Sequence, residues 1–176
     1  MGLRFAQNMA CAVFLALGAG GVNAQETSDN QVATKTAWAV FADSNPKECW
    51  AVSAPKETVN TKDGREVAVR RGDILLMTFF RPAAQVSGQL AFTGGYPFAK
   101  GSTVSMNIDG TVFELFTDGE WAWAASAAED AKIVAALKRG SNAVLTARSG
   151  RGTQTKDSFS LSGFTAAVED AEKRCN

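Results

Sequence analysis

The stretch TVSMNIDGTVFELFTDGEWAWA, residues 103–124, decides the fold class because it holds three short runs of β-forming side chains separated by Asp-Gly pairs. The pairs are Asp109-Gly110 and Asp118-Gly119. An Asp-Gly pair between alternating apolar runs is typical of a two-residue β-turn, since both residues tolerate a positive φ. The stretch therefore predicts an antiparallel meander of three strands.

Further short runs with period-two alternation lie on both sides of this meander. Residues 74–80 are continuously apolar, which is typical of a central strand. The many short strands, with turns at close intervals, predict a mainly all-β fold, an antiparallel, immunoglobulin-like β-sandwich. Besides the meander, strands are expected over 38–42, around Trp50, and over 66–70, 74–80, 86–92, 143–148 and 157–161.

Two helices are expected to interrupt the strands. Ser126 and Glu129 have the spacing of a capping box, in which the serine side chain accepts from a free backbone amide. Gly140 suits a left-handed residue at the end of this inserted helix. A second helix is expected over 164–174, near the end of the chain.

The first 24 residues have the order of a secretory signal peptide. Arg4 precedes an apolar stretch over 9–19, and the segment closes on Val22-Asn23-Ala24. The apolar stretch is too short for a transmembrane helix, which needs roughly 20 residues. We therefore expect cleavage after Ala24 and export to the periplasm, the cell surface or the medium, with a retained anchor as the alternative.

The rest of the chain is expected to be a flexible leader over 25–35, polar and without hydrophobic periodicity, followed by a single domain over 36–176. Loss of Arg4 would change the formal net charge from +0 to −1, which gives no electrostatic basis for binding nucleic acid. Two cysteines would remain, Cys49 and Cys175. An even number after export predicts one disulfide, with two free thiols as the alternative.

Catalytic chemistry has little support, because the sequence contains no histidine. This absence excludes Ser–His and Cys–His nucleophile pairs and the usual zinc ligand sets. Ser44 and Lys47 have the spacing of a lysine-activated serine, but they flank a predicted proline turn and lack the companion motifs. Glu114, Asp118 and Glu120 surround a predicted turn, with no sign of the cleft that paired carboxylates need. We therefore expect no catalytic residue, no metal site and no cofactor.

Trp121 and Trp123 are the first candidates for binding. They lie two residues apart in an expected strand, so both rings project from one face. Such a pair suits a sugar-stacking platform, a protein-binding hot spot or half of a core. We favour the core, which would place Ala122 and Ala124 on the outer face.

Two loops offer weaker candidates. Tyr96 and Phe98 follow Gly94-Gly95 in an irregular segment, and packing against the core is again favoured over exposure. The basic segment Gly150-Arg151-Gly152 is expected to be a flexible, solvated hairpin tip.

Several short pieces stand out along the chain: Trp38-Ala-Val40, Pro97-Phe98, Gly101, Val104, Ile108-Asp109-Gly110, Phe113, Phe116, Leu137-Lys-Arg-Gly140 and Phe159-Ser-Leu-Ser-Gly-Phe164. Together they resemble the invasion-associated locus B family, a family of exported alphaproteobacterial proteins. The resemblance runs from about Trp38 to Phe164 and implies a periplasmic or surface-associated β-sandwich without enzymatic activity, whose founding members are linked to entry into host cells. The chain differs from the family in its cysteines, since it has none near Phe41 and none in the hairpin around residues 116–121.

The sequence thus predicts a non-enzymatic exported protein that binds a protein in the envelope or at a host surface. The first alternative is a glycan- or small-molecule-binding module that uses Tyr96, Trp121 or Trp123. It requires one of these rings to be open in a concave site. A hydrolase is the least favoured alternative.

Overall fold

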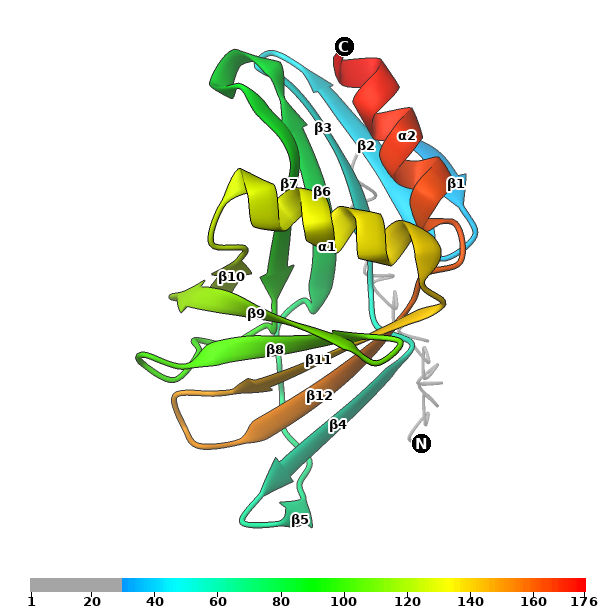
Figure 1. Ribbon diagram of the computed structural model, residues 1–176. Helices are drawn as coiled ribbons and strands as arrows, with labels where there is room; N and C mark the ends of the chain where they lie inside the picture. Colours follow the sequence, from blue (N-terminus) through cyan, green and yellow to red (C-terminus); the bar gives the residue numbers. More distant parts are fainter. Residues whose placement is uncertain (1–29) are drawn as a thin grey trace, which may run out of the picture.

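The computed structural model describes residues 30–176, in which twelve strands form one antiparallel sheet accompanied by two α-helices (Figure 1). The predicted class, mainly antiparallel β with one internal and one C-terminal helix, is confirmed. The expected signal peptide over 1–24 lies outside the described residues. The strands are β1 (Gln31–Lys35), β2 (Trp38–Ser44), β3 (Lys47–Ser53), β4 (Glu57–Lys62), β5 (Arg65–Glu66), β6 (Leu75–Arg81), β7 (Val86–Thr93), β8 (Thr103–Ile108), β9 (Thr111–Asp118), β10 (Trp121–Trp123), β11 (Asn142–Arg148) and β12 (Gln154–Ser160).

The sheet has the strand order β1-β2-β3-β6-β7-β10-β9-β8-β11-β12-β4-β5. Its two halves, β1 to β7 and β10 to β5 in this order, run in different directions, and the sheet bends between them (Figure 1). One cluster of buried side chains, contributed by both halves and both helices, fills the space inside the bend. The sheet is continuous, but its two halves enclose a shared core, so the fold resembles a sandwich.

The three strands of the meander form as predicted, but the second turn is wrong by one residue: Trp121 pairs with Asp118, so Gly119 and Glu120 form the turn. β8 pairs with β9 and β9 pairs with β10, all antiparallel. Asp109 and Gly110 have φ of 44° and 99°, so both central residues of the first turn are left-handed, as an Asp-Gly turn of this type requires. Asn107 Oδ1 accepts a hydrogen bond from the Gly110 amide at 2.8 Å.

The predicted leader over 25–35 is wrong for its last five residues, which form the edge strand β1. Ala33 pairs with Val40, and Lys35 pairs with Trp38. An edge strand needs little hydrophobic pattern, and of the β1 side chains Ala33 packs against the core. Because residues 31–35 are mostly polar, their sequence gives little sign of a strand, and β1 is held in place by its backbone pairing with β2.

The strand expected over 66–70 is also wrong. Only Arg65 and Glu66 are paired, as β5, and residues 67–74 form a loop. Val69 is 41% exposed, so the alternation of valines in this segment does not mark a buried face. β4, which precedes this segment, was not predicted.

The inserted helix α1 (Ala127–Arg139) begins as predicted, because Ser126 Oγ accepts a hydrogen bond from the Glu129 amide at 3.2 Å. The left-handed end predicted for Gly140 is wrong, since its φ of −83° and ψ of 166° are those of extended backbone. A glycine is needed there for space instead. A Cβ atom on Gly140 would lie 2.8 Å from Ile108 Cγ2 and 2.9 Å from Leu161 Cδ1.

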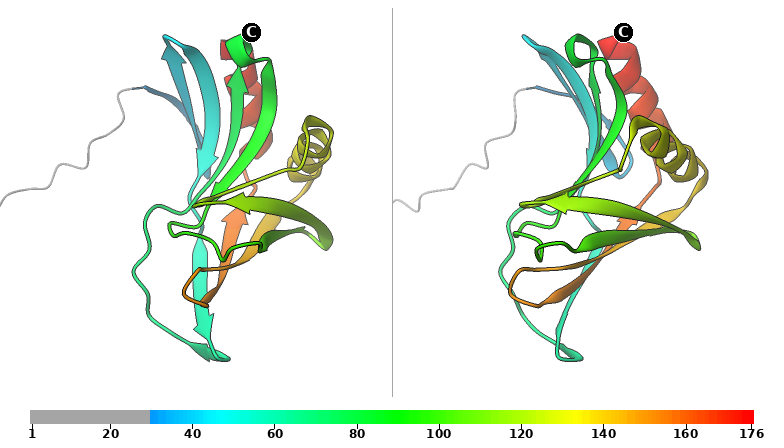
Figure 2. Two further views of the ribbon diagram at one scale, coloured as in Figure 1. Left: turned by 90° about the vertical axis from the view of Figure 1, so that its left-hand side faces the viewer. Right: turned by 60° about the vertical axis from the view of Figure 1, so that its left-hand side comes forward.

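The second helix, α2 (Phe164–Cys175), lies on the same side of the upper half of the sheet as α1 (Figure 2). α1 packs on β7, whereas α2 packs on β2, β3 and β6. A disulfide joins Cys175 to Cys49, with 5.8 Å between the Cα atoms, and so ties the end of α2 to β3. The side of the sheet opposite the helices carries no helix among the described residues (Figure 2).

Candidate functional site

Large apolar side chains form rows on the side of the sheet that faces away from both helices. In the first row Phe41 pairs with Trp50, and Trp50 pairs with Phe79. Directly paired residues project from the same side of a sheet, so the three rings are neighbours. The Phe41 and Trp50 rings are stacked, with centroids 5.3 Å apart and planes 5° apart.

Two further rows continue this surface onto β9 and β10. Val52, Met77, Ala91, Trp123 and Phe116 are paired successively across five strands. Leu75 and Trp121 both pair with Thr93 in the third row. We call this surface the aromatic face; its members are Phe41, Trp50, Val52, Leu75, Met77, Phe79, Ala91, Phe116, Trp121 and Trp123.

The expectation that Trp121 and Trp123 belong to the core is wrong. Ala122 and Ala124 are the buried residues, at 0% and 9% exposure, while Trp121 is 38% exposed and Trp123 is half-buried. The alternation of large and small side chains was predicted correctly. Which of them face the core, however, depends on the side of the sheet that the helices cover. The small residues of β10 fit the crowded interior of the bend, and the indoles lie on the aromatic face.

The aromatic face is graded from buried to exposed. Met77 and Phe79 are 5% and 9% exposed because neighbouring rings cover them, whereas Phe116 is 48% exposed. At the Phe79 end, the Arg81 guanidinium lies 4.3 Å from the ring centroid and donates to Glu48 Oε1 at 2.7 Å. The face therefore has a charged rim at one end and open aromatic rings at the other.

A pocket of about 580 Å³ lies where three loops of the lower half meet. The loops are residues 67–74, 94–102 and 149–153. Glu120, in the turn before β10, also lines the pocket and is the neighbour of Trp121 in the chain. The lining residues are Ala68, Val69, Arg70, Arg71, Gly95, Tyr96, Pro97, Glu120, Ser149, Gly150, Arg151, Thr153 and Thr155.

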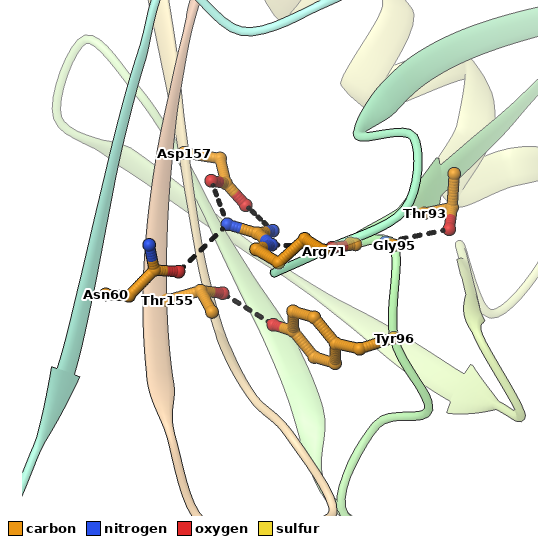
Figure 3. Close-up of polar contacts among 8 residues, drawn as sticks. Asn60, Arg71, Thr93, Gly95, Tyr96, Thr155 and Asp157 are labelled. Atoms are coloured by element: carbon orange, nitrogen blue, oxygen red, sulfur yellow. Dashed lines mark hydrogen bonds and ion pairs between the residues drawn. The ribbon is translucent and has the colours of Figure 1, made fainter. Parts of the chain in front are cut away.

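Arg71 forms the structural centre of this pocket (Figure 3). Its two terminal nitrogens donate to the two oxygens of Asp157 at 2.7 and 2.6 Å. Its Nε donates to the Gly94 carbonyl at 2.8 Å, and Nη1 also donates to Asn60 Oδ1 at 3.2 Å. One buried side chain thus joins the 67–74 loop to β12, to β4 and to the end of β7.

Tyr96 packs beside this ion pair. The Arg71 guanidinium lies 5.0 Å from its ring centroid, and its hydroxyl is hydrogen-bonded to Thr155 Oγ1 (Figure 3). Burial raises the pKa of the Tyr96 hydroxyl above its usual 10.0, although the hydrogen bond with Thr155 acts in the opposite direction. Tyr96 is therefore a neutral, positioned wall of the pocket.

Gly72 and Gly95 hold two of the loops in direct backbone contact. The Gly72 amide donates to the Gly95 carbonyl at 2.9 Å, and Gly95 has a φ of 71°. A Cβ atom on Gly95 would lie 2.5 Å from the Gly72 carbonyl oxygen. Only glycine combines this left-handed conformation with so close an approach.

The comparisons with known proteins agree with this architecture. The model of the invasion associated locus B (IalB) protein family matches residues 38–172. The chain belongs to the IalB family. This IalB-family protein is also similar to the crystal structure of invasion associated protein B from Bartonella henselae, with a TM-score of 0.52 and 19% identity, over 79% of this chain and 94% of that one. No curated protein matches the chain.

Several residues were considered for catalysis and disfavoured, and neither described pocket of this IalB-family protein is lined by Ser44, Lys47, Glu114 or Asp118. Ser44 and Lys47 are exposed across the turn between β2 and β3, and Lys47 Nζ donates to the Asn176 carbonyl. Glu114 accepts a hydrogen bond from Thr103 Oγ1 at 2.7 Å, away from Glu120 in the pocket. In residues 30–176, no three Cys, Asp or Glu side chains are grouped so that they could hold a metal ion.

Three of the four binding candidates of the IalB-family chain divide between two sites, and the fourth is buried. Trp121 and Trp123 belong to the aromatic face, Tyr96 lines the pocket, and Phe98 is buried at 7% exposure. Neither helix of the described chain is long and apolar enough to cross a membrane.

Sequence reasoning missed most of the pocket. Arg70 is the last residue of the strand expected over 66–70, Arg71 follows it directly, and Arg151 lies in the expected flexible tip. This tip is held by its neighbours, since the Gly150 amide donates to the Pro97 carbonyl at 2.9 Å and Phe98 forms an isolated bridge with Ser149. A double arginine next to a glycine was the available signal.

Proposed function

We propose that this IalB-family protein is a non-enzymatic, exported protein that binds a protein partner in the envelope or at a host-cell surface through its aromatic face. The observation that carries the proposal is a sheet surface on which no helix of residues 30–176 packs and in which Phe116 is 48% and Trp121 38% exposed. Aromatic residues, methionine and arginine are enriched where proteins bind each other, and the half-buried rings of Trp50 and Trp123 are of this kind.

The shape of the aromatic face favours a protein over a glycan. The Trp121 and Trp123 rings lie 5.8 Å apart on a sheet surface, and neither lines the described pockets. Small ligands are usually held in concave sites, whereas protein interfaces are often broad, with an apolar centre and a polar rim. Arg81, with Glu48 and Gln89 as its hydrogen-bond acceptors, provides such a rim.

The test compares an aromatic-face variant with a matched surface variant. Phe116→Ser/Trp121→Ser removes the two most exposed rings, and Val32→Ser changes an apolar side chain that is 40% exposed on β1, outside the face. The full chain is expressed with a C-terminal tag, and proteins from envelope and host-surface fractions are captured and quantified. We expect a partner that wild type and Val32→Ser retain and that the double variant loses.

Two results would contradict this proposal. A partner that the double variant retains would mean that the aromatic face is not the interface. A dimer of the wild-type protein by light scattering that becomes a monomer in the double variant would mean that a second copy covers the face. N-terminal sequencing of the exported protein, expected to begin at Gln25, tests the export part separately.

A second candidate function, small-molecule binding, has one specific observation in its favour. Tyr96, one of the rings on which that alternative depended, lines the pocket between the three loops. The chemistry of that pocket is independent of the aromatic face.

A further inference from the structure

The pocket contains unneutralised positive charge. Arg71 and Asp157 form an internal ion pair, so they add no net charge to the site. The remaining charged lining residues are Arg70, Arg151 and Glu120, all exposed. None of these three side chains has an ion-pair or hydrogen-bond partner within residues 30–176.

Hydroxyl groups add hydrogen-bond donors at the same place. Ser149 and Thr153 line the pocket and are only 9% and 8% exposed. Ser149 Oγ accepts a hydrogen bond from the Thr153 amide at 3.1 Å, which leaves its own proton free to be donated. The Thr153 hydroxyl has no side-chain hydrogen bond within the described part of the chain.

The walls that carry these groups are well held. The bidentate Arg71–Asp157 pair joins the loop of Arg70 to β12. The hairpin tip with Arg151 is joined to the 94–102 loop through the Gly150 amide and the Pro97 carbonyl. A site with positioned donors loses less conformational entropy on binding than a mobile loop does.

We propose that this pocket binds a small organic anion. Arg70 and Arg151 meet its carboxylate or phosphate group, together with the hydroxyls of Ser149 and Thr153. Arginine suits this task because its guanidinium is always charged and donates several hydrogen bonds in a fixed geometry. With Arg71 neutralised by Asp157, the remaining lining charges of Arg70, Arg151 and Glu120 sum to +1, although the chain as a whole has no formal excess of either sign.

The volume and the remaining walls indicate that the ligand is more than a bare inorganic ion. A pocket of about 580 Å³ is within the range of small-molecule sites and much larger than a phosphate group. Val69, which is 41% exposed, and the ring of Tyr96 provide apolar surface beside the basic groups. The ligand therefore carries an apolar part that packs against these two side chains.

The test uses phenyl phosphate as the probe and follows binding by calorimetry and by NMR chemical shifts of the full chain. We expect saturable binding at millimolar or lower concentration, with shifts confined to the three loops. Benzyl alcohol and benzylammonium have similar apolar parts but no negative charge, and we expect neither to bind. Benzoate distinguishes a carboxylate from a phosphate ligand, and tighter binding of either anion supports the proposal.

The variants Arg70→Gln and Arg151→Gln remove one charge each from exposed positions. Each should weaken phenyl phosphate binding about fivefold or more, since hydrogen bonds to charged groups are among the stronger ones and solvent screening reduces their effect here. Glu120→Gln removes the opposing carboxylate and should tighten binding. Arg139→Gln, at the exposed C-terminal end of α1, makes the same charge change far from the pocket and should leave binding unchanged.

Three results would overturn the proposal. The first is that neither phenyl phosphate nor benzoate binds saturably at millimolar concentration. The second is that benzyl alcohol binds as tightly as phenyl phosphate. The third is that Arg139→Gln weakens phenyl phosphate binding as much as Arg151→Gln does. Inorganic phosphate that binds as tightly as phenyl phosphate would refute the apolar part of the ligand. Neither Phe116 nor Trp121 lines the pocket, so the variant Phe116→Ser/Trp121→Ser should still bind phenyl phosphate. Failure of protein binding and failure of anion binding are therefore separate outcomes.

Discussion

Replacement of Arg71 should markedly lower the stability of the fold. Its side chain is 6% exposed and that of its partner Asp157 is 0% exposed, so removing one charge leaves the other buried and uncompensated. Such a loss costs about 3–5 kcal/mol. We expect Arg71→Met to lower the free energy of unfolding in urea by this amount. The double variant Arg71→Met/Asp157→Leu should recover most of the loss, because apolar residues replace a buried ion pair at little cost.

The control for this prediction is a surface ion pair of the same length. Lys132 Nζ lies 2.6 Å from Glu129 Oε1, with side chains 65% and 40% exposed. Lys132→Met should cost less than about 1 kcal/mol. If Arg71→Met were equally mild, the pair would not be the anchor of the pocket wall.

Asp130 is a buried carboxylate with a specific structural role. β10 pairs with β7 only from Ala91 to Thr93, and Asp130 Oδ1 accepts from the next amide, that of Leu90, at 2.8 Å. Burial raises the pKa of Asp130 above its usual 3.8. The folded state therefore binds this proton more tightly than the unfolded state, and the contribution of Asp130 to stability increases as pH falls through the raised pKa towards 3.8.

The variant Asp130→Asn tests this pH dependence, since asparagine keeps an acceptor for the Leu90 amide without a charge. We expect the variant to be favoured relative to wild type most at neutral pH, with the difference shrinking as pH falls below the raised pKa. Urea unfolding at a series of pH values measures it. A difference that is constant with pH would contradict the assignment.

Asp170 provides a control of opposite sign. Its hydrogen bond from Arg174 lowers the pKa of Asp170 below 3.8, so its carboxylate stabilises the fold above that pH and loses this effect as pH falls through the lowered pKa. Asp170→Asn should therefore be least favourable at neutral pH.

At the scale of elements, α1 ends against the sheet, and the reason for its terminal glycine can be tested. A left-handed cap would tolerate asparagine better than alanine, because asparagine adopts that conformation more readily. Gly140 is extended and lacks space, since an added Cβ would approach Ile108 and Leu161 within 2.9 Å. We expect Gly140→Ala to cost about 1–3 kcal/mol through overpacking, and Gly140→Asn to cost more. Thermal unfolding midpoints of the two variants distinguish these explanations. A higher midpoint for Gly140→Asn than for Gly140→Ala would support a left-handed cap instead.

Local chemistry explains which elements could be predicted from the sequence. The turn at Asp109-Gly110 and the start of α1 at Ser126 each depend on side chains and backbone within a few residues, and both were found. The strand β1 depends on pairing with β2 rather than on its own composition, and it was missed. The direction of the Trp121 and Trp123 rings was also wrong, because it depends on which side of the sheet α1 and α2 cover.

The same distinction applies to the two candidate sites. The period-two alternation of a strand predicts that Trp121 and Trp123 project from the same face, so this part of the aromatic face could be predicted from the sequence. Its other members come from β2, β3, β6 and β9 and are joined only by strand order. The pocket depends on three loops that are distant in the chain. The sequence marked Tyr96 as a binding candidate and Arg151 as part of a hairpin tip, but nothing in it placed the two together.

At the scale of the whole molecule, the bend gives the two sides of the sheet different roles: the inner side holds the core and the outer side carries the aromatic face. The inner side, with both helices, buries the core, and this burial leaves the aromatic face outside. The pocket lies beyond the bend, where Glu120 is adjacent in sequence to Trp121. A protein partner on the aromatic face would therefore approach the pocket rim at this point.

The disulfide acts on the whole chain, since Cys49 and Cys175 are separated by 126 residues. The chain-entropy model assigns such a loop a stabilisation of roughly 4–5 kcal/mol, as an upper bound because unfolded chains retain some structure. A disulfide leaves no thiol to react, so alkylation of the denatured, non-reduced chain over 25–176 should add no mass. Denaturation is needed because both cysteines are almost fully buried, at 1% and 3% exposure. Addition of two groups would show free thiols.

The variant Cys49→Ala/Cys175→Ala should fold and yet be less stable. α2 keeps its own apolar anchors on β2 and β3, with Phe164 and Val168 buried at 0% and 1% exposure, so the helix remains docked without the covalent bond. We expect the urea midpoint to fall and amide exchange to quicken first at the C-terminal end of α2, because that end is held mainly by Cys175. Unchanged exchange in α2, together with an unchanged midpoint, would mean that packing alone fixes this helix and that the bond adds nothing to the folded chain.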